Sequence, residues 1–195
     1  MPGEVRASGP VTAWAATGYI PGVTVDLAAR IRDVPDFPTP GIVFKDIMPL
    51  LADPPALHEA VERLAEYAEP RRPELILGAE ARGFILGGAL AYRLDCGFAA
   101  ARKPGKLPWR TRSVEYALEY GTDSLEVHED AIHEGMRVLI HDDVLATGGT
   151  ARAKVGLVEQ LSGVVVGLAF LVELRFLDGR SQLQGHDVCS LVEYD

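Results

Sequence analysis

Two acids stand next to a run of small and hydroxyl residues in the string DDVLATGGT, residues 142–150. Gly148 and Gly149 let backbone N–H groups approach an anion, while Thr147 and Thr150 add hydroxyl donors. A helix that starts here also presents the positive end of its dipole to that anion. These residues indicate a site for a phosphate monoester; the alternative is a polar turn that only caps a helix.

The acid pair, Asp142 and Asp143, follows an apolar run that is typical of a buried strand, residues 137–142. In open α/β sheets, ligands bind outside the carboxyl ends of the strands. Carboxylates at that place can meet ribose hydroxyls or the water bound to a magnesium ion. The acid pair therefore suits a phosphorylated sugar beside the phosphate turn, as residues 146–150 are called below.

The elements that must position these residues can be predicted from the apolar periods. Strands and helices alternate along most of the chain, which favours an α/β fold with an open, mostly parallel sheet flanked by helices. Residues 103–130 are polar and irregular, with alternating stretches at 116–120 and 125–128 that predict a β-hairpin. The expected strands are 75–78, 97–102, 137–142, 164–171 and 188–192, and the expected helices are 25–34, 53–69, 83–94 and 149–161.

The chain begins with a stretch rich in Ala, Gly, Pro and Thr, residues 1–23, which we expect to be a poorly ordered extension. The remaining residues, 24–195, fit one domain of ordinary size. Within it, Leu27, Ile31 and Val34 have the spacing of a short amphipathic helix, and the proline-rich run 35–41 ends that helix.

Composition excludes several classes of protein. A formal net charge of -9 argues against non-specific binding to nucleic acid or to an anionic membrane. The longest apolar stretch, residues 164–172, is about half of what a membrane-spanning helix needs. The N-terminus lacks the pattern of a signal peptide, so a cytoplasmic location is expected. The histidines and the two cysteines show no metal-ligand or redox spacing.

The thirteen residues 138–150 resemble the motif with which type I phosphoribosyltransferases bind 5-phosphoribosyl 1-pyrophosphate (PRPP). Only His141 is unusual in that strand. The resemblance implies the fold of this family, with a small N-terminal hood and a flexible β-hairpin loop. It implies that Asp142 and Asp143 meet the ribose hydroxyls. The residues implied for the 5-phosphate are Ala146, Thr147, Gly148, Gly149 and Thr150.

Residues 36–47, DFPTPGIVFKDI, resemble the hood segment of the adenine-specific branch of that family, which we place at about 34–48. The resemblance implies that Phe44 offers an aromatic face to a purine and that the backbone of Val43 and Lys45 pairs with the polar edge of the base. Taken alone, Phe44 would be assigned to the core.

Residues 78–84, GAEARGF, resemble the pyrophosphate loop of the family. Arg82 and the backbone N–H groups from Ala81 to Gly83 would hold the leaving pyrophosphate at a helix start. Glu80 would organise the loop or meet a metal-bound water. The alternative is an exposed ion pair between Glu80 and Arg82.

Residues 102–108, RKPGKLP, and 116–121, YALEYG, resemble the flexible catalytic loop, which we place at about 103–120. Three cations of this loop would hold pyrophosphate as its charge grows, and the alternative is that they are solvated loop charges. Glu119 is the candidate acid at the imidazole edge of the purine, flanked by Tyr120, unless it is an outward strand residue. The three cations are Arg102, Lys103 and Lys106.

The resemblance implies transfer of the phosphoribosyl group from PRPP to adenine, giving AMP and pyrophosphate, with Mg²⁺ entering on PRPP. Pyrophosphate would leave ribose C1 through an oxocarbenium-like transition state, with Glu119, Arg82 and Lys106 as the catalytic residues. A homodimer is expected from the family.

Two alternative functions share the phosphate turn: a transferase for xanthine, guanine or hypoxanthine, and a PRPP-sensing regulator without catalysis. The strings around Phe44 and Glu119 argue against the first alternative, and the acidic charge argues against a nucleic-acid-binding regulator.

Overall fold

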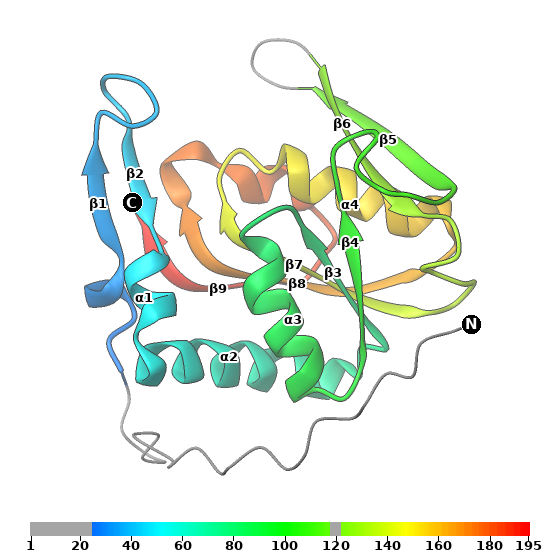
Figure 1. The fold of residues 1–195 in the computed structure, drawn as a ribbon, viewed down its shortest axis with the longest axis horizontal. Helices are drawn as coiled ribbons and strands as arrows, with labels where there is room; N and C mark the ends of the chain where they lie inside the picture. Colours follow the sequence, from blue (N-terminus) through cyan, green and yellow to red (C-terminus); the bar gives the residue numbers. More distant parts are fainter. Residues whose placement is uncertain (1–24, 118–121) are drawn as a thin grey trace, which may run out of the picture.

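The centre of the molecule is a five-stranded parallel sheet in the order β4-β3-β7-β8-β9 (Figure 1). The computed structural model describes residues 25–117 and 122–195, so the expected extension, 1–23, lies outside the described residues. The strands are β3 (Leu75–Ala79), β4 (Gly97–Ala101), β7 (Arg137–Leu145), β8 (Val164–Leu174) and β9 (Val188–Tyr194). The predicted α/β class with a mainly parallel sheet is confirmed.

Helices cover both faces of this sheet. On one face lie α1 (Met48–Ala52), α2 (Pro54–Ala68) and α3 (Gly83–Arg93), and on the other lies α4 (Gly149–Gln160) with the hairpin β5 (Thr111–Ala117) and β6 (Thr122–His128). Because successive strand residues point to opposite faces, Leu75 and Leu77 join the α4 side and Ile76 joins the α2 and α3 side. Burial on both faces explains why the strands are uninterrupted apolar runs.

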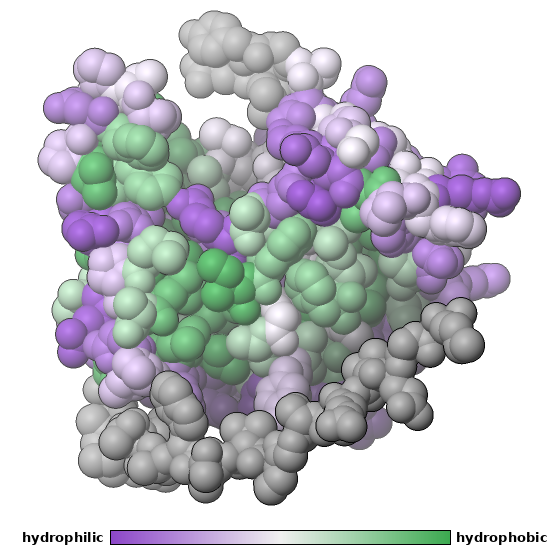
Figure 2. All heavy atoms as spheres, viewed as in Figure 1, coloured by the Kyte–Doolittle hydropathy of each residue, from purple (hydrophilic) through white to green (hydrophobic). Residues whose placement is uncertain are grey.

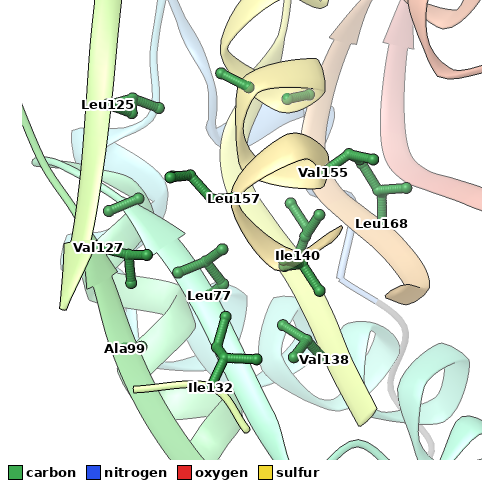
Figure 3. Packing of buried hydrophobic residues seen from close by; sticks show 14 of the residues in the cluster. Leu77, Ala99, Leu125, Val127, Ile132, Val138, Ile140, Val155, Leu157 and Leu168 are labelled. Carbon is green, nitrogen blue, oxygen red and sulfur yellow. The ribbon is translucent and has the colours of Figure 1, made fainter. Parts of the chain in front are cut away.

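The core on the α4 side connects the sheet to the hairpin (Figure 3). Leu77 and Ile140 of the sheet pack with Leu157 of α4 and with Leu125 and Val127 of β6 in one cluster of buried side chains. The prediction of a hairpin is confirmed, but its first strand lies at Thr111–Ala117, mostly before the expected stretch at 116–120, and its second begins three residues before the expected 125–128. Residues 118–121, between β5 and β6 in the sequence, lie outside the described residues.

The expected helix over residues 25–34 is wrong. The chain forms only a short 3-10 turn, η1 (Ala28–Arg30), and then the strand β1 (Arg32–Pro35), which pairs antiparallel with β2 (Val43–Asp46). Two ion pairs join residues that are directly opposite in this register: Arg32 with Asp46 and Lys45 with Asp33, each at 2.6 Å. Pairing with a distant segment outweighs the local helical spacing.

The other predicted elements are present with small shifts of their ends, and β7 runs three residues further than expected, to Leu145. Three more 3-10 segments follow strands or helices: η2 (Glu69–Arg71), η3 (Arg175–Leu177) and η4 (Gly179–Leu183). Among the described residues, none of the helices is long and apolar enough to span a membrane. The hairpins β1–β2 and β5–β6 stand at opposite flanks of the sheet (Figure 1).

Candidate active site

A pocket of about 370 Å³ lies where the carboxyl ends of β3 and β7 meet the β1–β2 hairpin. Residues 42–45, 79–82, 142–151 and Leu174 line it. The sequence-predicted residues of the hood, of the pyrophosphate loop, of the acid pair and of the phosphate turn therefore meet in one cavity. Gly83 lies just behind it, because a Cβ atom added there would be 2.6 Å from Asp142 Oδ1.

The acid pair lies inside the extended β7, on two consecutive residues. Asp142 Oδ1 accepts a hydrogen bond of 3.0 Å from the backbone N–H of Asp143, and Asp142 Oδ2 accepts one of 2.8 Å from Lys154 Nζ. Asp143 is only 5% exposed, and its carboxylate lies 2.7 Å from Arg82 Nε. Burial, followed by the charge of Asp142, raises the pKa of Asp143 well above its usual range, and Arg82 offsets only part of this.

The phosphate turn contains a glycine in the left-handed region. Gly148 has φ +86 and is the N-cap of α4, which starts at Gly149. An added Cβ atom would lie 2.4 Å from the Gly179 carbonyl oxygen, so the turn and the η4 segment are in direct contact. The start of a helix at the end of a strand is the geometry in which backbone N–H groups bind phosphate.

Glu80 and Arg82 have different partners, so the alternative prediction of an exposed ion pair between them is wrong. Glu80 accepts hydrogen bonds of 2.8 Å from the Lys103 backbone N–H and from Arg102 Nε. The first of these contributes most to lowering the pKa of Glu80. Arg82 instead pairs with Asp143. The Glu80–Ala81 peptide bond is cis.

Phe44 lines the pocket and is half-buried. The Arg82 guanidinium carbon is 4.9 Å from the centroid of its ring, and the Phe37 ring packs edge-on at 5.2 Å. The ammonium of Lys45 lies over the Tyr194 ring at 3.8 Å and binds Asp33, so its side chain is engaged away from the cavity. Sequence reasoning assigned the backbone of Lys45, and not its side chain, to the base.

The three cations of the flexible loop are not among the pocket residues. Arg102 binds Glu80 and donates to the Lys106 carbonyl at 2.9 Å. The Lys103 ammonium contacts Asp123, which also accepts a hydrogen bond of 3.1 Å from Tyr116. Glu119 and Tyr120 lie outside the described residues.

Sequence reasoning missed several residues. Ile42 and Leu174 line the pocket, and Lys154 is a fully buried charged side chain beside the acid pair. A lysine within the apolar pattern of α4 is the signal that could have revealed Lys154. His141 is buried in the core, where its Nδ1 donates to the Ala169 carbonyl at 2.9 Å; burial lowers its pKa to about 4.

The sheet, the strand-end acids and the phosphate turn define a type I phosphoribosyltransferase, and the family model described as Phosphoribosyl transferase domain matches residues 51–188. The adenine phosphoribosyltransferase of Symbiobacterium thermophilum is 56% identical over 170 residues, which are 87% of this chain and 100% of the relative. The crystal structure of the enzyme from Thermoanaerobacter pseudethanolicus superposes with a TM-score of 0.84 at 55% identity, covering 86% of this chain and 98% of that one.

A more distant solved structure comes from Saccharomyces cerevisiae, whose adenine phosphoribosyltransferase is complexed with an imino-altritol bisphosphate and adenine. It has a TM-score of 0.81 at 37% identity and covers 85% of this chain and 96% of that chain. The chain therefore belongs to the adenine phosphoribosyltransferases.

Proposed function

We propose that this protein transfers the 5-phosphoribosyl group of PRPP to adenine, producing AMP and pyrophosphate for purine salvage. The observation that carries the proposal is the single cavity in which an aromatic face, an arginine, an acid pair and a phosphate turn meet. Family membership supports the same reaction.

The phosphate turn is proposed to hold the 5-phosphate, through the backbone N–H groups of residues 146–150 and the hydroxyls of Thr147 and Thr150. The left-handed Gly148 and the start of α4 at Gly149 support this role, because they aim a helix N-terminus at the cavity.

Asp142 and Asp143 are proposed to accept hydrogen bonds from the ribose hydroxyls. Their carboxylate oxygens also suit magnesium, which prefers hard oxygen ligands. Because Lys154 and Arg82 already contact these carboxylates, we expect Mg²⁺ to enter on PRPP and to meet the acids through bound water. When bound, the ion would neutralise charge on the departing pyrophosphate.

Pyrophosphate is proposed to bind the Arg82 side chain and the backbone at Ala81 and Gly83, where α3 begins. Arg102, Lys103 and Lys106 would join it from the flexible loop. In the described structure Arg102 and Lys103 are paired with Glu80 and with Asp123, so their engagement requires the loop to move. Such a movement would also exclude water from ribose C1.

Adenine is proposed to lie against Phe44, with its polar edge toward the backbone of Val43 and Lys45. The adenine in the yeast complex supports this choice of base. As the bond from C1 to pyrophosphate breaks, positive charge develops on the sugar and N9 of adenine attacks the opposite face. The protein then needs to hold the base in line and to stabilise the leaving group, and Glu119 would accept the proton that N9 loses.

A homodimer in the cytoplasm is proposed as the working form. An apolar area on α3 and β4 supports the dimer: Ile85 is 45% exposed, Tyr92 is 91% exposed and Phe98 is 37% exposed. Figure 2 shows apolar side chains gathered over α3 on this face. Exposed apolar surface of this kind marks association sites.

The first test is AMP formation from PRPP, magnesium and each purine base, with Glu119→Ala and Lys106→Ala alongside the wild type and Glu66→Ala, an exposed position on α2, as a control. A preference for adenine that both loop substitutions weaken is the expected result, and EDTA should abolish turnover. Turnover of guanine, xanthine or hypoxanthine would assign the protein to a sister activity. Binding of PRPP without turnover of any base would identify a sensor.

A further inference from the structure

Lys154 is a charged side chain with no exposed surface, one turn beyond the phosphate turn. Its ammonium donates to two acceptors at 2.8 Å, the carbonyl of His141 and the carboxylate of Asp142. A buried ammonium is costly unless such partners satisfy it, so these two contacts decide where the side chain can lie.

The position of Lys154 in the helix gives these contacts a geometric consequence. It lies four residues after Thr150, on the same helix face, and side chains of a helix lean toward its N-terminus. The ammonium therefore joins α4, which presents the phosphate turn, to the strand β7, which carries the acid pair. Residues 143–149, which connect Asp142 to α4, all line the cavity.

The Asp142 carboxylate has little freedom at this place. Lys154 holds Oδ2, the Asp143 backbone N–H holds Oδ1, and Gly83 approaches so closely that an added Cβ atom would be 2.6 Å from Oδ1. Of these three constraints, only the ammonium connects the carboxylate to the helix of the phosphate turn.

We propose that Lys154 is a positioning residue that fixes the Asp142 carboxylate relative to the phosphate turn. The site thereby selects ligands whose 5-phosphate and ribose hydroxyls lie at a fixed distance from each other. The inference rests on the proposed function, because it takes those two groups as the ones that the turn and the acid pair bind. It assigns to Lys154 a role in recognising the sugar without touching it.

The test compares the affinity of two nucleotides, AMP and 2′,3′-dideoxy-AMP, which lacks both ribose hydroxyls, by isothermal titration calorimetry. In the wild type AMP should bind more tightly. In Lys154→Met, which keeps the length of the side chain and removes the charge, this preference should fall about tenfold, as expected when one charge-assisted hydrogen bond is lost. Affinity for the dideoxy nucleotide should stay within about threefold, because the phosphate turn remains.

Two further variants separate positioning from stability. Lys154→Gln retains a neutral hydrogen-bond donor and is the variant to use if Lys154→Met does not fold. It should lose part of the preference for AMP over 2′,3′-dideoxy-AMP. Val158→Ala removes buried apolar volume from the same helix and should lower the melting temperature while leaving the preference intact.

Equal weakening of both nucleotides in the Lys154 variants, or an unchanged preference, would overturn the inference. A wild type without any preference for AMP would also overturn it, even if that enzyme converts adenine and PRPP to AMP. A wild type that prefers AMP but turns over no base would instead count against the proposed activity.

Discussion

Arg82 and Asp143 form an ion pair of 2.7 Å between residues that are far apart in sequence, with one partner at the start of α3 and the other on β7. The same guanidinium lies 4.9 Å from the Phe44 ring. Arg82 therefore touches the proposed sugar site and the proposed base site at once.

Replacing this arginine should affect both substrates. We expect Arg82→Ala to lower kcat/KM by about 10²-fold or more, because the cation proposed to hold the leaving group is lost. Arg82→Lys should recover only part of the activity, since an ammonium lacks the planar fork. Steady-state kinetics with each substrate varied in turn will measure this.

The matched control is Arg93→Ala at the other end of α3, where the arginine binds Glu62 at 2.8 Å. It should leave kcat/KM unchanged within about twofold, as for an exposed pair. If kcat/KM falls as much in Arg93→Ala as in Arg82→Ala, the loss does not depend on the position of Arg82 in the site, and the prediction is wrong.

The contact between the η4 segment and the phosphate turn predicts a second effect. In Gly179→Ala the new Cβ atom would lie 2.1 Å from the Ala146 carbonyl oxygen, so the turn must shift. KM for PRPP should rise about tenfold or more while KM for adenine changes little. Gly156→Ala on α4 is the control, since its new methyl group would meet only Val114, at 3.5 Å. Equal KM values for PRPP in the two variants would contradict the prediction.

A buried carboxylate outside the pocket predicts how stability depends on pH. Glu173 is 3% exposed and accepts hydrogen bonds from Arg180 and from Ser190. Burial alone would raise its pKa, but these bonds outweigh burial and leave the pKa lowered from the ordinary 4.5. Ionised Glu173 therefore adds stability above pH 4.5, and this contribution is lost as pH falls through the lowered pKa.

Denaturant unfolding of Glu173→Gln will check this. The variant should be less stable than the wild type by about 1–2 kcal/mol at neutral pH. The difference should narrow below pH 4.5, the ordinary pKa of the residue. Glu62→Gln, in an exposed pair with Arg93, should change the free energy of unfolding by less than about 0.5 kcal/mol at any pH. A constant difference for Glu173→Gln across the pH range would show that its charge is not the cause.

The paired loop cations predict a change on ligand binding. If Arg102 and Lys103 leave Glu80 and Asp123 for pyrophosphate, amide hydrogen exchange over residues 103–116 should slow when PRPP and magnesium are added. Residues 129–136, which follow the hairpin, should exchange as before. Exchange that PRPP leaves unaffected over the loop would count against its closure.

Much of the fold could be predicted from the sequence because the strands are continuous apolar runs and the helices have a clear period. The helix expected at 25–34 failed because Leu27, Ile31 and Val34 fit a helix locally, whereas the partner of Val34 in the hairpin is Phe44, ten residues later. Pairing between segments is invisible to a periodic pattern.

The site could be predicted as a set of segments but not as a set of contacts. Glu80 and Arg82 are close in sequence, and an ion pair between them was the alternative to a pyrophosphate loop, yet the fold pairs Glu80 with Arg102 and Arg82 with Asp143. Lys154 attracted no attention because a lysine in a helix is normally exposed. Each of these charged side chains has its partner on another helix, strand or loop. Those partners become neighbours only when the elements pack around the sheet.

The hairpin β1–β2 forms a separate two-stranded sheet, and none of the described central strands extends into it. Under the proposed function, the element that faces the base therefore shares no backbone ladder with the elements that hold the sugar and the phosphates. Base choice and sugar chemistry are then modular: evolution can replace the hairpin to accept another heterocycle while the strand-end acids and the phosphate turn stay in register.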